Sequence, residues 1–344
     1  MDLESARKLW QPEPGWLNTA TYGLPPTPAY EAVLAAQRDW RTGHTAWEGG
    51  DAETARADFA ALVGADASDI AIGGNVSSLL APVAVSLPPG TRVVLPDIEF
   101  TSNVFPWMVH EPRGVDVTAV PPAKLAASID AHTDVVAYSL VQSADGTIAD
   151  DTEIVAAARA HGAMVVVDGT QAVGWLPVDA TRYDVLAVAG YKWLMNPRGT
   201  AYAYLAPGVR DRFVPVAAGW AAGEDVHTSY YGPPLRLAAD ARRFDISPAW
   251  FAWVGAAPAL ALVREIGVER IGAHNIALAN RFLAGLGLPP GNSAIVTVDA
   301  PGADEALRAA GIRAAVRAGR LRASFHLYTT EADADAAVDA LSAG

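Results

Sequence analysis

The stretch Val185-Leu-Ala-Val-Ala-Gly-Tyr-Lys-Trp-Leu-Met195 decides how the rest of the chain is interpreted. It begins as an apolar segment of strand length and runs into Lys192. Lysine occurs elsewhere only at Lys8 and Lys124, while arginine is frequent. An amine can lose its proton and attack a carbonyl, whereas a guanidinium stays charged. Lys192 is therefore a candidate nucleophile, although a lysine that ends a buried strand and extends to water fits this position equally well.

The composition excludes several classes of protein. The 344 residues suffice for one large and one small domain. The absence of cysteine excludes disulfides, thiolate metal ligands and a cysteine nucleophile. A formal charge of −13 argues against nucleic acid or an anionic membrane as a partner. Because the apolar runs are strand-length and the N-terminus lacks the features of a secretory signal, we expect a soluble, cytoplasmic protein.

The histidines give no reason to propose a metal site. All seven are scattered along the chain, and no two have the spacing that places both imidazoles on one helical turn. No acidic cluster lies beside them in the sequence. We therefore predict no bound metal.

Strand-like and helix-like segments alternate between about residues 60 and 205. Apolar runs predict strands at 69–73, 92–95, 116–120, 134–140, 164–168, 184–189 and 201–205. Alanine-rich segments such as 149–161 lie between them and predict helices. This alternation is typical of an α/β fold, in which a mostly parallel, seven-stranded sheet is covered by helices on both sides. No Gly-x-Gly-x-x-Gly or Walker-type loop appears, which disfavours an ordinary dinucleotide or P-loop site.

The C-terminal part predicts a second, smaller α+β domain. A loop rich in Gly, Tyr and Pro at 217–240 precedes a helical region at about 248–285. A strand at 294–298, a helix near 303–310, strands near 312–316 and 320–327, and a helix at 331–341 follow. We therefore expect a large domain at 17–240 and a small domain at 241–344 that includes the N-terminal segment 1–16.

Asp168 and Lys192 each come at or just after the end of a predicted strand. In a parallel sheet these ends meet at one edge, where α/β proteins bind their ligands. A lysine and an aspartate there suit pyridoxal 5′-phosphate, which needs an amine for a Schiff base and a carboxylate for its pyridine nitrogen. Asp168 could equally be a helix N-cap, because Gly-Thr-Gln-Ala-Val follows it.

The segments around both residues resemble the class V aminotransferase family. The resemblance is carried by Val167-Asp-Gly-Thr-Gln-Ala-Val-Gly-Trp-Leu-Pro-Val178 and by the stretch that contains Lys192. Further matches are Gly73-Gly-Asn-Val-Ser-Ser78, Asp97-Ile-Glu-Phe-Thr-Ser-Asn103 and the segment from Arg320 to Asp333. Together they run from about residue 17 to the C-terminus. The resemblance implies a fold-type I enzyme that depends on pyridoxal 5′-phosphate and acts as a homodimer with active sites at the subunit interface.

The resemblance also assigns roles to individual residues. Lys192 would bind the cofactor and then act as general base or acid. Arg322 and Gln142 would bind a small amino-acid substrate, Arg322 through the substrate carboxylate. The residues that would contact the cofactor are Asp168, Gln171, Thr170, Asn75, Val76, Ser77, Phe100, Tyr191 and Ser247.

Four of these positions have more specific expected contacts. Asp168 would pair with the pyridine nitrogen, and Gln171 would bind the phenolic oxygen. Tyr191 would reach the phosphate, as in the kynureninase branch. Ser247 matches a threonine that reaches the phosphate in the partner subunit. The loop 219–235 is the candidate for substrate specificity, although an ordinary dimer-interface loop fits it equally well.

Departures from the family narrow the chemistry. Phe100 stands where cysteine desulfurases have a histidine, Gln142 where they have asparagine, and Ala189 lacks a hydroxyl present in some members. Without cysteine, the persulfide step of a desulfurase has no nucleophile. We expect an aminotransferase or a C–S (β-elimination) lyase. An epimerase or decarboxylase, or a non-catalytic regulator that binds the cofactor, remains the alternative.

Overall fold

A seven-stranded sheet forms the centre of the computed structural model, which describes residues 1–45 and 50–342. The strand order is β1-β7-β6-β5-β4-β2-β3, and only the two pairs that involve β7 are antiparallel. The strands are β1 Ile70–Gly73, β2 Arg92–Pro96, β3 Asp116–Val120, β4 Val135–Ser139, β5 Met164–Asp168, β6 Val185–Ala189 and β7 Ala201–Leu205. The predicted α/β fold with a mostly parallel sheet is confirmed.

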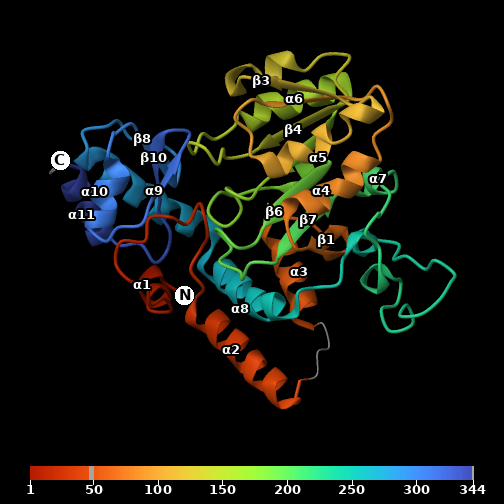
Figure 1. Cartoon of the computed structure of the whole chain (residues 1–344), viewed down its shortest axis with the longest axis horizontal. Helices are drawn as coiled ribbons and strands as arrows, with labels where there is room; N and C mark the ends of the chain where they lie inside the picture. Colours follow the sequence, from red (N-terminus) through yellow and green to blue (C-terminus); the bar gives the residue numbers. More distant parts are fainter. Residues whose placement is uncertain (46–49, 343–344) are drawn as a thin grey trace.

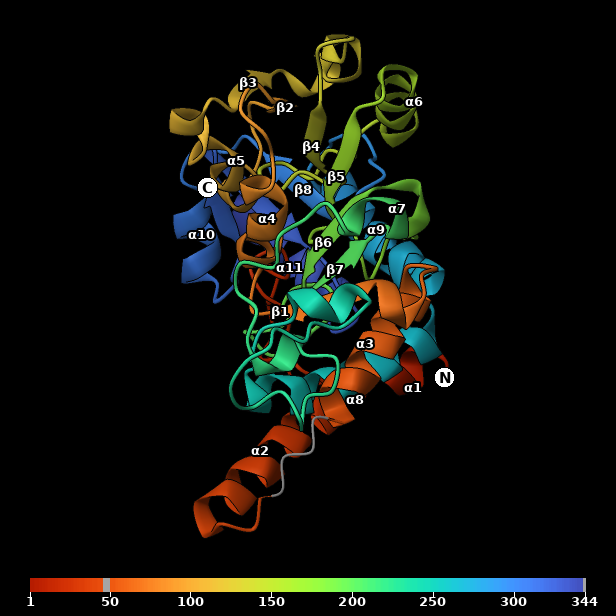
Figure 2. The same cartoon turned by 90° about the vertical axis from the view of Figure 1, so that its right-hand side faces the viewer.

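Helices cover both faces of this sheet, as Figures 1 and 2 show. In β5, Val165 and Val167 belong to one apolar core and Val166 to another, because successive side chains point to opposite faces. Helix α4 packs on the face of Val166. The other face is covered by α3, α6 and α8. The helices of this part are α2 Thr27–Thr42, α3 Gly50–Leu62, α4 Val76–Val85, α5 Phe105–Met108, α6 Asp151–His161, α7 Pro207–Arg210 and α8 Trp250–Ile266.

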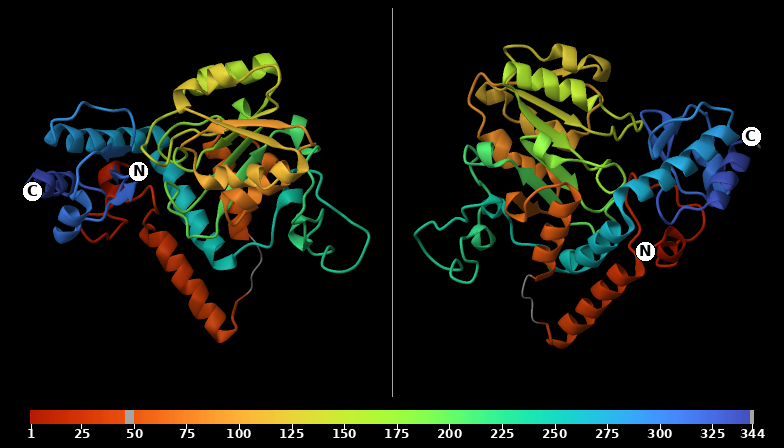
Figure 3. Two further views of the ribbon diagram at one scale, coloured as in Figure 1. Left: turned by 45° about the horizontal axis from the view of Figure 1, so that its top comes forward. Right: turned by 180° about the vertical axis from the view of Figure 1, so that it is seen from behind.

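A three-stranded antiparallel sheet with the order β8-β10-β9 forms the smaller part (Figure 3). Its core includes Leu321 and Ala323 from the sheet and Leu17 from the N-terminal segment, which runs beside β10. The elements are α1 Leu3–Arg7, α9 Val268–Gly285, β8 Ile295–Val298, α10 Ala303–Ala309, β9 Ala315–Arg317, β10 Arg320–Ser324 and α11 Glu331–Ser342. The predicted α+β arrangement of this part is confirmed.

The helical region expected at about 248–285 consists of two helices. They meet at an angle of 83°, where Gly267 adopts a φ of 92° that favours glycine. Helix α8 packs on α2 and α3, whereas α9 packs on α11. The division at residue 240 stays a prediction, and residues 46–49 and 343–344 of the expected domains lie outside the described residues.

Within the described residues, no single helix is both long and apolar enough to cross a bilayer. Helices α8 and α9 together meet the same length and composition criteria only as a bent pair.

Helix α2 packs on α8, and its C-terminal end projects from the molecule (Figure 1). Its one buried residue is Ala29. The aromatic side chains of Tyr30 and Trp40 remain 55% and 62% exposed, respectively. Trp40 contacts Phe251 edge to face, with 5.6 Å between the ring centroids. Tyr30 and Trp40 therefore leave aromatic surface of this helix exposed.

Candidate active site

The predicted site residues converge at the carboxyl ends of the parallel strands. Asp168 ends β5, and Lys192 follows the end of β6 by three residues. A pocket forms there between the strand ends and the N-terminus of α4. Its lining residues are Asn75, Val76, Phe100, Ser102, Ser139, Ser143, Asp168, Thr170, Gln171, Ala189, Tyr191 and Lys192. Most residues expected to contact a cofactor therefore lie around one cavity.

Lys192 is buried at the centre of this group, with 6% of its surface exposed. Its Nζ lies 5.4 Å from the centroid of the Phe100 ring. Burial lowers the pKa of Lys192 from 10.5 to about 8, although the nearby Asp168 carboxylate acts in the opposite direction. A buried amine with this pKa can exchange protons near neutral pH.

Asp168 is buried beside Lys192. Its Oδ1 accepts a hydrogen bond of 2.8 Å from the backbone N–H of Thr170. Burial raises the pKa of Asp168, while the hydrogen bonds from Thr170 and the charge of Lys192 oppose this rise. The hydroxyl of Thr170 in turn accepts a 3.0 Å bond from the N–H of Ala189, so this pair of strand ends is held together. Asp168 thus caps a local turn and also stands in the pocket.

A serine that the sequence did not single out joins two predicted residues. The hydroxyl of Ser143 accepts a hydrogen bond of 3.1 Å from Nε2 of Gln171 and one of 3.2 Å from Nη1 of Arg322. Gln171 also donates to the carbonyl of Ala20 at 3.0 Å, and its Oε1 accepts from the indole N–H of Trp193 at 2.8 Å. Both N–H groups of the Gln171 amide are therefore occupied, and a bond to a cofactor oxygen would replace one of them.

Arg322 is only 1% exposed. Its guanidinium donates to the Ser143 carbonyl and, at 3.1 Å, to the Thr21 hydroxyl. Its Nε has no hydrogen-bond partner among the described residues, and no carboxylate there forms an ion pair with it. Burial, together with the charge of Arg317, lowers its pKa to about 10. A buried cation without a counterion is suited to an anionic ligand.

Glu99 is a second buried carboxylate near the site that sequence reasoning did not identify. It accepts hydrogen bonds from the backbone N–H of Ser139 at 2.7 Å, from the Ser139 hydroxyl and from Nε2 of Gln142 at 3.1 Å. Burial raises the pKa of Glu99, whereas the hydrogen bonds from Ser139 act to lower it. The bond to Glu99 fixes the orientation of the Gln142 amide. The Oε1 atom of Gln142 has no hydrogen-bond partner among the described residues.

The N-terminus of α4 provides the candidate phosphate position. Asn75 caps this helix. Its side chain accepts one hydrogen bond of 2.9 Å from the N–H of Ser78 and another of 2.8 Å from the hydroxyl of Ser77. The first backbone N–H groups of a helix favour an anion. Tyr191 lines the same pocket, and the guanidinium of Arg198 lies 4.3 Å from its ring centroid.

Four predicted residues do not line the pocket. Ser77 is turned to the side chain of Asn75. Arg322 donates to the lining residue Ser143, whereas Gln142 reaches the lining only through Glu99, which is bonded to Ser139. Ser247 is exposed and separate from the lining residues, which leaves its expected contact with a partner subunit as a prediction.

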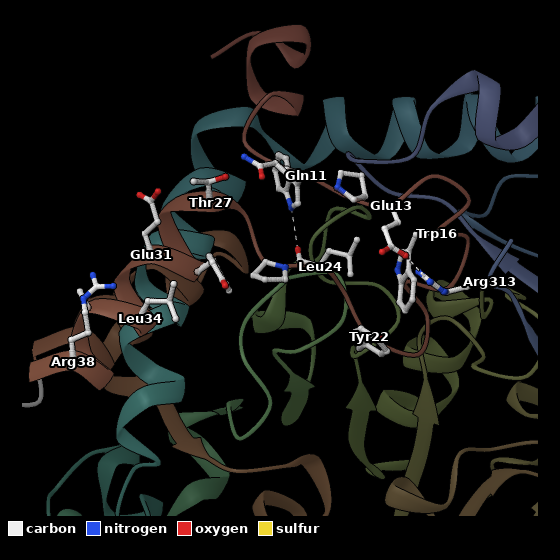
Figure 4. Close-up of a pocket in the computed structure, with 15 residues that line it drawn as sticks. Gln11, Glu13, Trp16, Tyr22, Leu24, Thr27, Glu31, Leu34, Arg38 and Arg313 are labelled. Carbon is white, nitrogen blue, oxygen red and sulfur yellow. Dashed lines mark hydrogen bonds and ion pairs between the residues drawn. The ribbon is translucent and has the colours of Figure 1, made fainter. Parts of the chain in front are cut away.

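A larger hollow of about 860 Å³ lies between the N-terminal segment and α2 (Figure 4). Trp10, Trp16 and Tyr22 contribute aromatic surface to it. Of its two arginines, Arg313 is paired with Glu13 at 2.7 Å and Arg38 is exposed. Because it holds no predicted site residue and no unpaired buried charge, we place the chemistry in the pocket of Lys192.

Comparisons with known proteins identify the family of this chain. A family model described as aminotransferase class-V matches residues 40–303. An uncharacterized aminotransferase, YcbU of Bacillus subtilis, is 28% identical, with 91% of this chain and 88% of that protein covered. Isopenicillin N epimerase of Streptomyces clavuligerus is 30% identical, with 99% of this chain and 98% of that protein covered.

Solved structures share the fold. The cystine C–S lyase C-DES, in complex with its product cysteine persulfide, superposes with a TM-score of 0.86 at 22% identity and covers 96% of this chain and 97% of that chain. The cysteine desulfurase CsdA of Escherichia coli gives a TM-score of 0.83 at 21% identity, with coverage of 100% and 98%. Their likeness supports the fold-type I architecture. With its fold, its strand-end lysine and aspartate, and the match over most of its length, this chain belongs to the class V aminotransferase family.

Proposed function

We propose that this protein is a pyridoxal 5′-phosphate-dependent enzyme that acts on an α-amino acid, as an aminotransferase or as a C–S (β-elimination) lyase. The observation that carries the proposal is the burial of Lys192 and Asp168 together at the strand ends. The nearby guanidinium of Arg322, which lacks a carboxylate partner among the described residues, adds a place for the substrate carboxylate.

The donor set around the pocket fits this cofactor. Asp168 can hold the pyridine nitrogen in its protonated form, and Phe100 lies where a ring could stack. Lys192 would bind the carbonyl carbon, and the start of α4 would bind the phosphate. When bound, pyridoxal phosphate supplies an electron sink for bonds at the substrate α-carbon. The remaining expected contacts are those of Gln171, Thr170, Val76, Ser77, Tyr191 and Ser247.

The chain's own groups account for proton transfer and substrate orientation. With a pKa of about 8, Lys192 is partly neutral near pH 7 to 8 and can take or return a proton at the α-carbon. A planar guanidinium binds a carboxylate through two parallel hydrogen bonds, so Arg322 would fix the orientation of the amino acid. Gln142, positioned by Glu99, presents an unpaired oxygen near the same place.

Several observations bear on the choice of reaction. The lack of cysteine argues against a persulfide-type desulfurase. YcbU is called an aminotransferase, and the fold neighbour C-DES is a C–S lyase. A structure titled as a C-DES variant with glycine covalently linked to its PLP cofactor also shares the fold, with a TM-score of 0.87 at 22% identity. The near-complete coverage of isopenicillin N epimerase favours epimerisation as the second candidate.

We also propose a homodimer in the cytoplasm, with Ser247 directed to the partner's site. Ser247 lies outside the pocket of its own chain. The loop 219–235 places Tyr231 and Leu235 at 90% and 81% exposure, which suits an interface. Light scattering of the purified protein tests this: a dimer is expected, and a monomer at micromolar concentration would contradict it.

Visible absorption of the purified protein, before and after addition of a panel of amino acids, tests the reaction. A yellow band that changes with particular amino acids is expected, and the Lys192→Ala variant should lack turnover. Pyruvate and ammonia would identify elimination, conversion to the pyridoxamine form would identify transamination, and a change in substrate chirality would identify epimerisation. A protein that stays colourless after added pyridoxal phosphate would refute the proposal.

A further inference from the structure

One face of the small sheet carries a row of arginines that leads to the active site. Strand β10 pairs with β9 so that Arg320 lies opposite Arg317 and Arg322 opposite Ala315. The two-residue turn between the strands, Ala318 and Gly319 with φ of 47° and 77°, fixes this register. Because alternate residues of a strand share a face, the side chains of Arg317, Arg320 and Arg322 lie on the same side of the sheet.

This face is the one turned toward Lys192. The opposite face carries Leu321 and Ala323, which are buried in the core of the small part. Arg322, at the inner end of the row, contacts Ser143 in the lining of the pocket. Arg317 and Arg320, by contrast, are exposed, so the row extends from the buried guanidinium of Arg322 to the surface.

The row adds positive charge that the described residues do not neutralise. None of its three arginines forms an ion pair with a carboxylate of residues 1–45 or 50–342. The charge of Arg317 contributes to the lowered pKa of both Arg322 and Lys192, after burial itself. A chain with a net charge of −13 thus concentrates uncompensated positive charge here, and a bound anion would relieve the repulsion.

The spacing along this face suits a ligand with two acidic groups. Diagonal neighbours on paired strands, such as Arg322 and Arg317, are about 7–8 Å apart at their backbones. The residues directly beside Arg322 on this face are small, Ala315 on β9 and Thr297 on β8. Neither of these neighbours has a long side chain.

We propose that the substrate is an acidic amino acid, whose α-carboxylate is bound by Arg322 and whose side-chain anion is bound by Arg317. This rests on the proposed function, in which Arg322 binds the α-carboxylate of an amino acid. Arg317 then selects among amino acids at the rim of the pocket.

Titration of the cofactor absorption of the holoenzyme tests the selection. L-Glutamate and L-aspartate should bind about tenfold more tightly than L-glutamine and L-asparagine, since one charge-assisted hydrogen bond separates them. Arg317→Gln should abolish this preference and leave the amides unaffected. Arg320→Gln, which removes the same charge from the same face at the position opposite Arg317, is the matched control and should keep the preference. Equal binding of acids and amides, or equal effects of both variants, would overturn the inference.

Calorimetry with glutarate separates this inference from the proposed function. If no amino acid changes the absorption, the proposed function fails, but glutarate still tests the pair of arginines without any chemistry. Glutarate binding that is lost in Arg317→Gln and kept in Arg320→Gln would support the dianion site. Binding that is absent in the unaltered protein, or the same in both variants, would overturn it.

Discussion

Replacement of Lys192 by methionine should make the cofactor-free protein more stable at neutral pH. Methionine is similar in size and uncharged, so it occupies the buried space without the cost of a desolvated ammonium. The fall in pKa from 10.5 to about 8 corresponds to about 3 kcal/mol of unfolding free energy, at about 1.4 kcal/mol per pKa unit. The active site therefore carries a stability cost that removal of the amine should relieve.

The size of this effect should depend on pH in a defined direction. The folded-state pKa lies below the unfolded one, so the unfolded chain binds more protons between pH 8 and pH 10.5, and stability rises with pH in that window. At pH 7 almost the whole cost of about 3 kcal/mol is present, and about 2 kcal/mol of it should be recovered by pH 9.5. The advantage of Lys192→Met over the unaltered protein should shrink by that amount.

Urea unfolding of the cofactor-free proteins at pH 7 and pH 9.5 measures both quantities. Lys124→Met, a replacement of an exposed lysine, serves as the control and should change stability little at either pH. If Lys192→Met were no more stable at pH 7, or if its advantage did not fall with rising pH, the account of Lys192 as a buried amine with a lowered pKa would be wrong.

Three further predictions concern buried charged residues. Asp168→Asn should weaken retention of pyridoxal phosphate by about tenfold or more, measured by dialysis and absorption, because an amide cannot hold the pyridine nitrogen protonated. Arg322→Gln should weaken amino-acid binding by about tenfold to a hundredfold in a spectral titration, with cofactor content unchanged. Asp245→Asn should destabilise the protein by about 1–3 kcal/mol in urea unfolding, because it removes the buried carboxylate bonded to Arg56 at 2.6 Å and leaves Arg56 only the largely exposed carboxylate of Glu53; unchanged unfolding would contradict this.

The elements of the large sheet could be predicted because their signals are local. Strands β5 and β7 have the predicted limits, since each is an apolar run flanked by Gly, Asp or Pro and buried on both faces. The limits of the strands in the small sheet were predicted less well, because contacts with segments distant in the sequence decide where these strands end. Strand β10 was expected to reach residue 327 but ends at Ser324, whose N–H donates to the carbonyl of Leu17. No sequence pattern near residue 324 reports a contact with residue 17.

The same distinction separates the site residues that were identified from those that were missed. Lys192 and Asp168 each lie in a sequence motif, so their residue type and position in the motif identify them as candidate site residues. Ser143 and Thr21 acquire their significance only by meeting Arg322 across more than a hundred residues of chain. Glu99 lies inside a recognised motif, yet its role depends on burial and on bonds from Ser139, which appear only in three dimensions.

Peptide mapping after borohydride reduction tests the central claim most directly. Borohydride converts the C=N bond between a lysine and pyridoxal phosphate into a stable amine, and this chain offers only Lys8, Lys124 and Lys192 as side-chain amines. Mass spectrometry of the digested protein should find the cofactor mass on the peptide that contains Lys192. Labelling of Lys8 or Lys124 instead, or no label on a yellow protein, would contradict the assignment of Lys192.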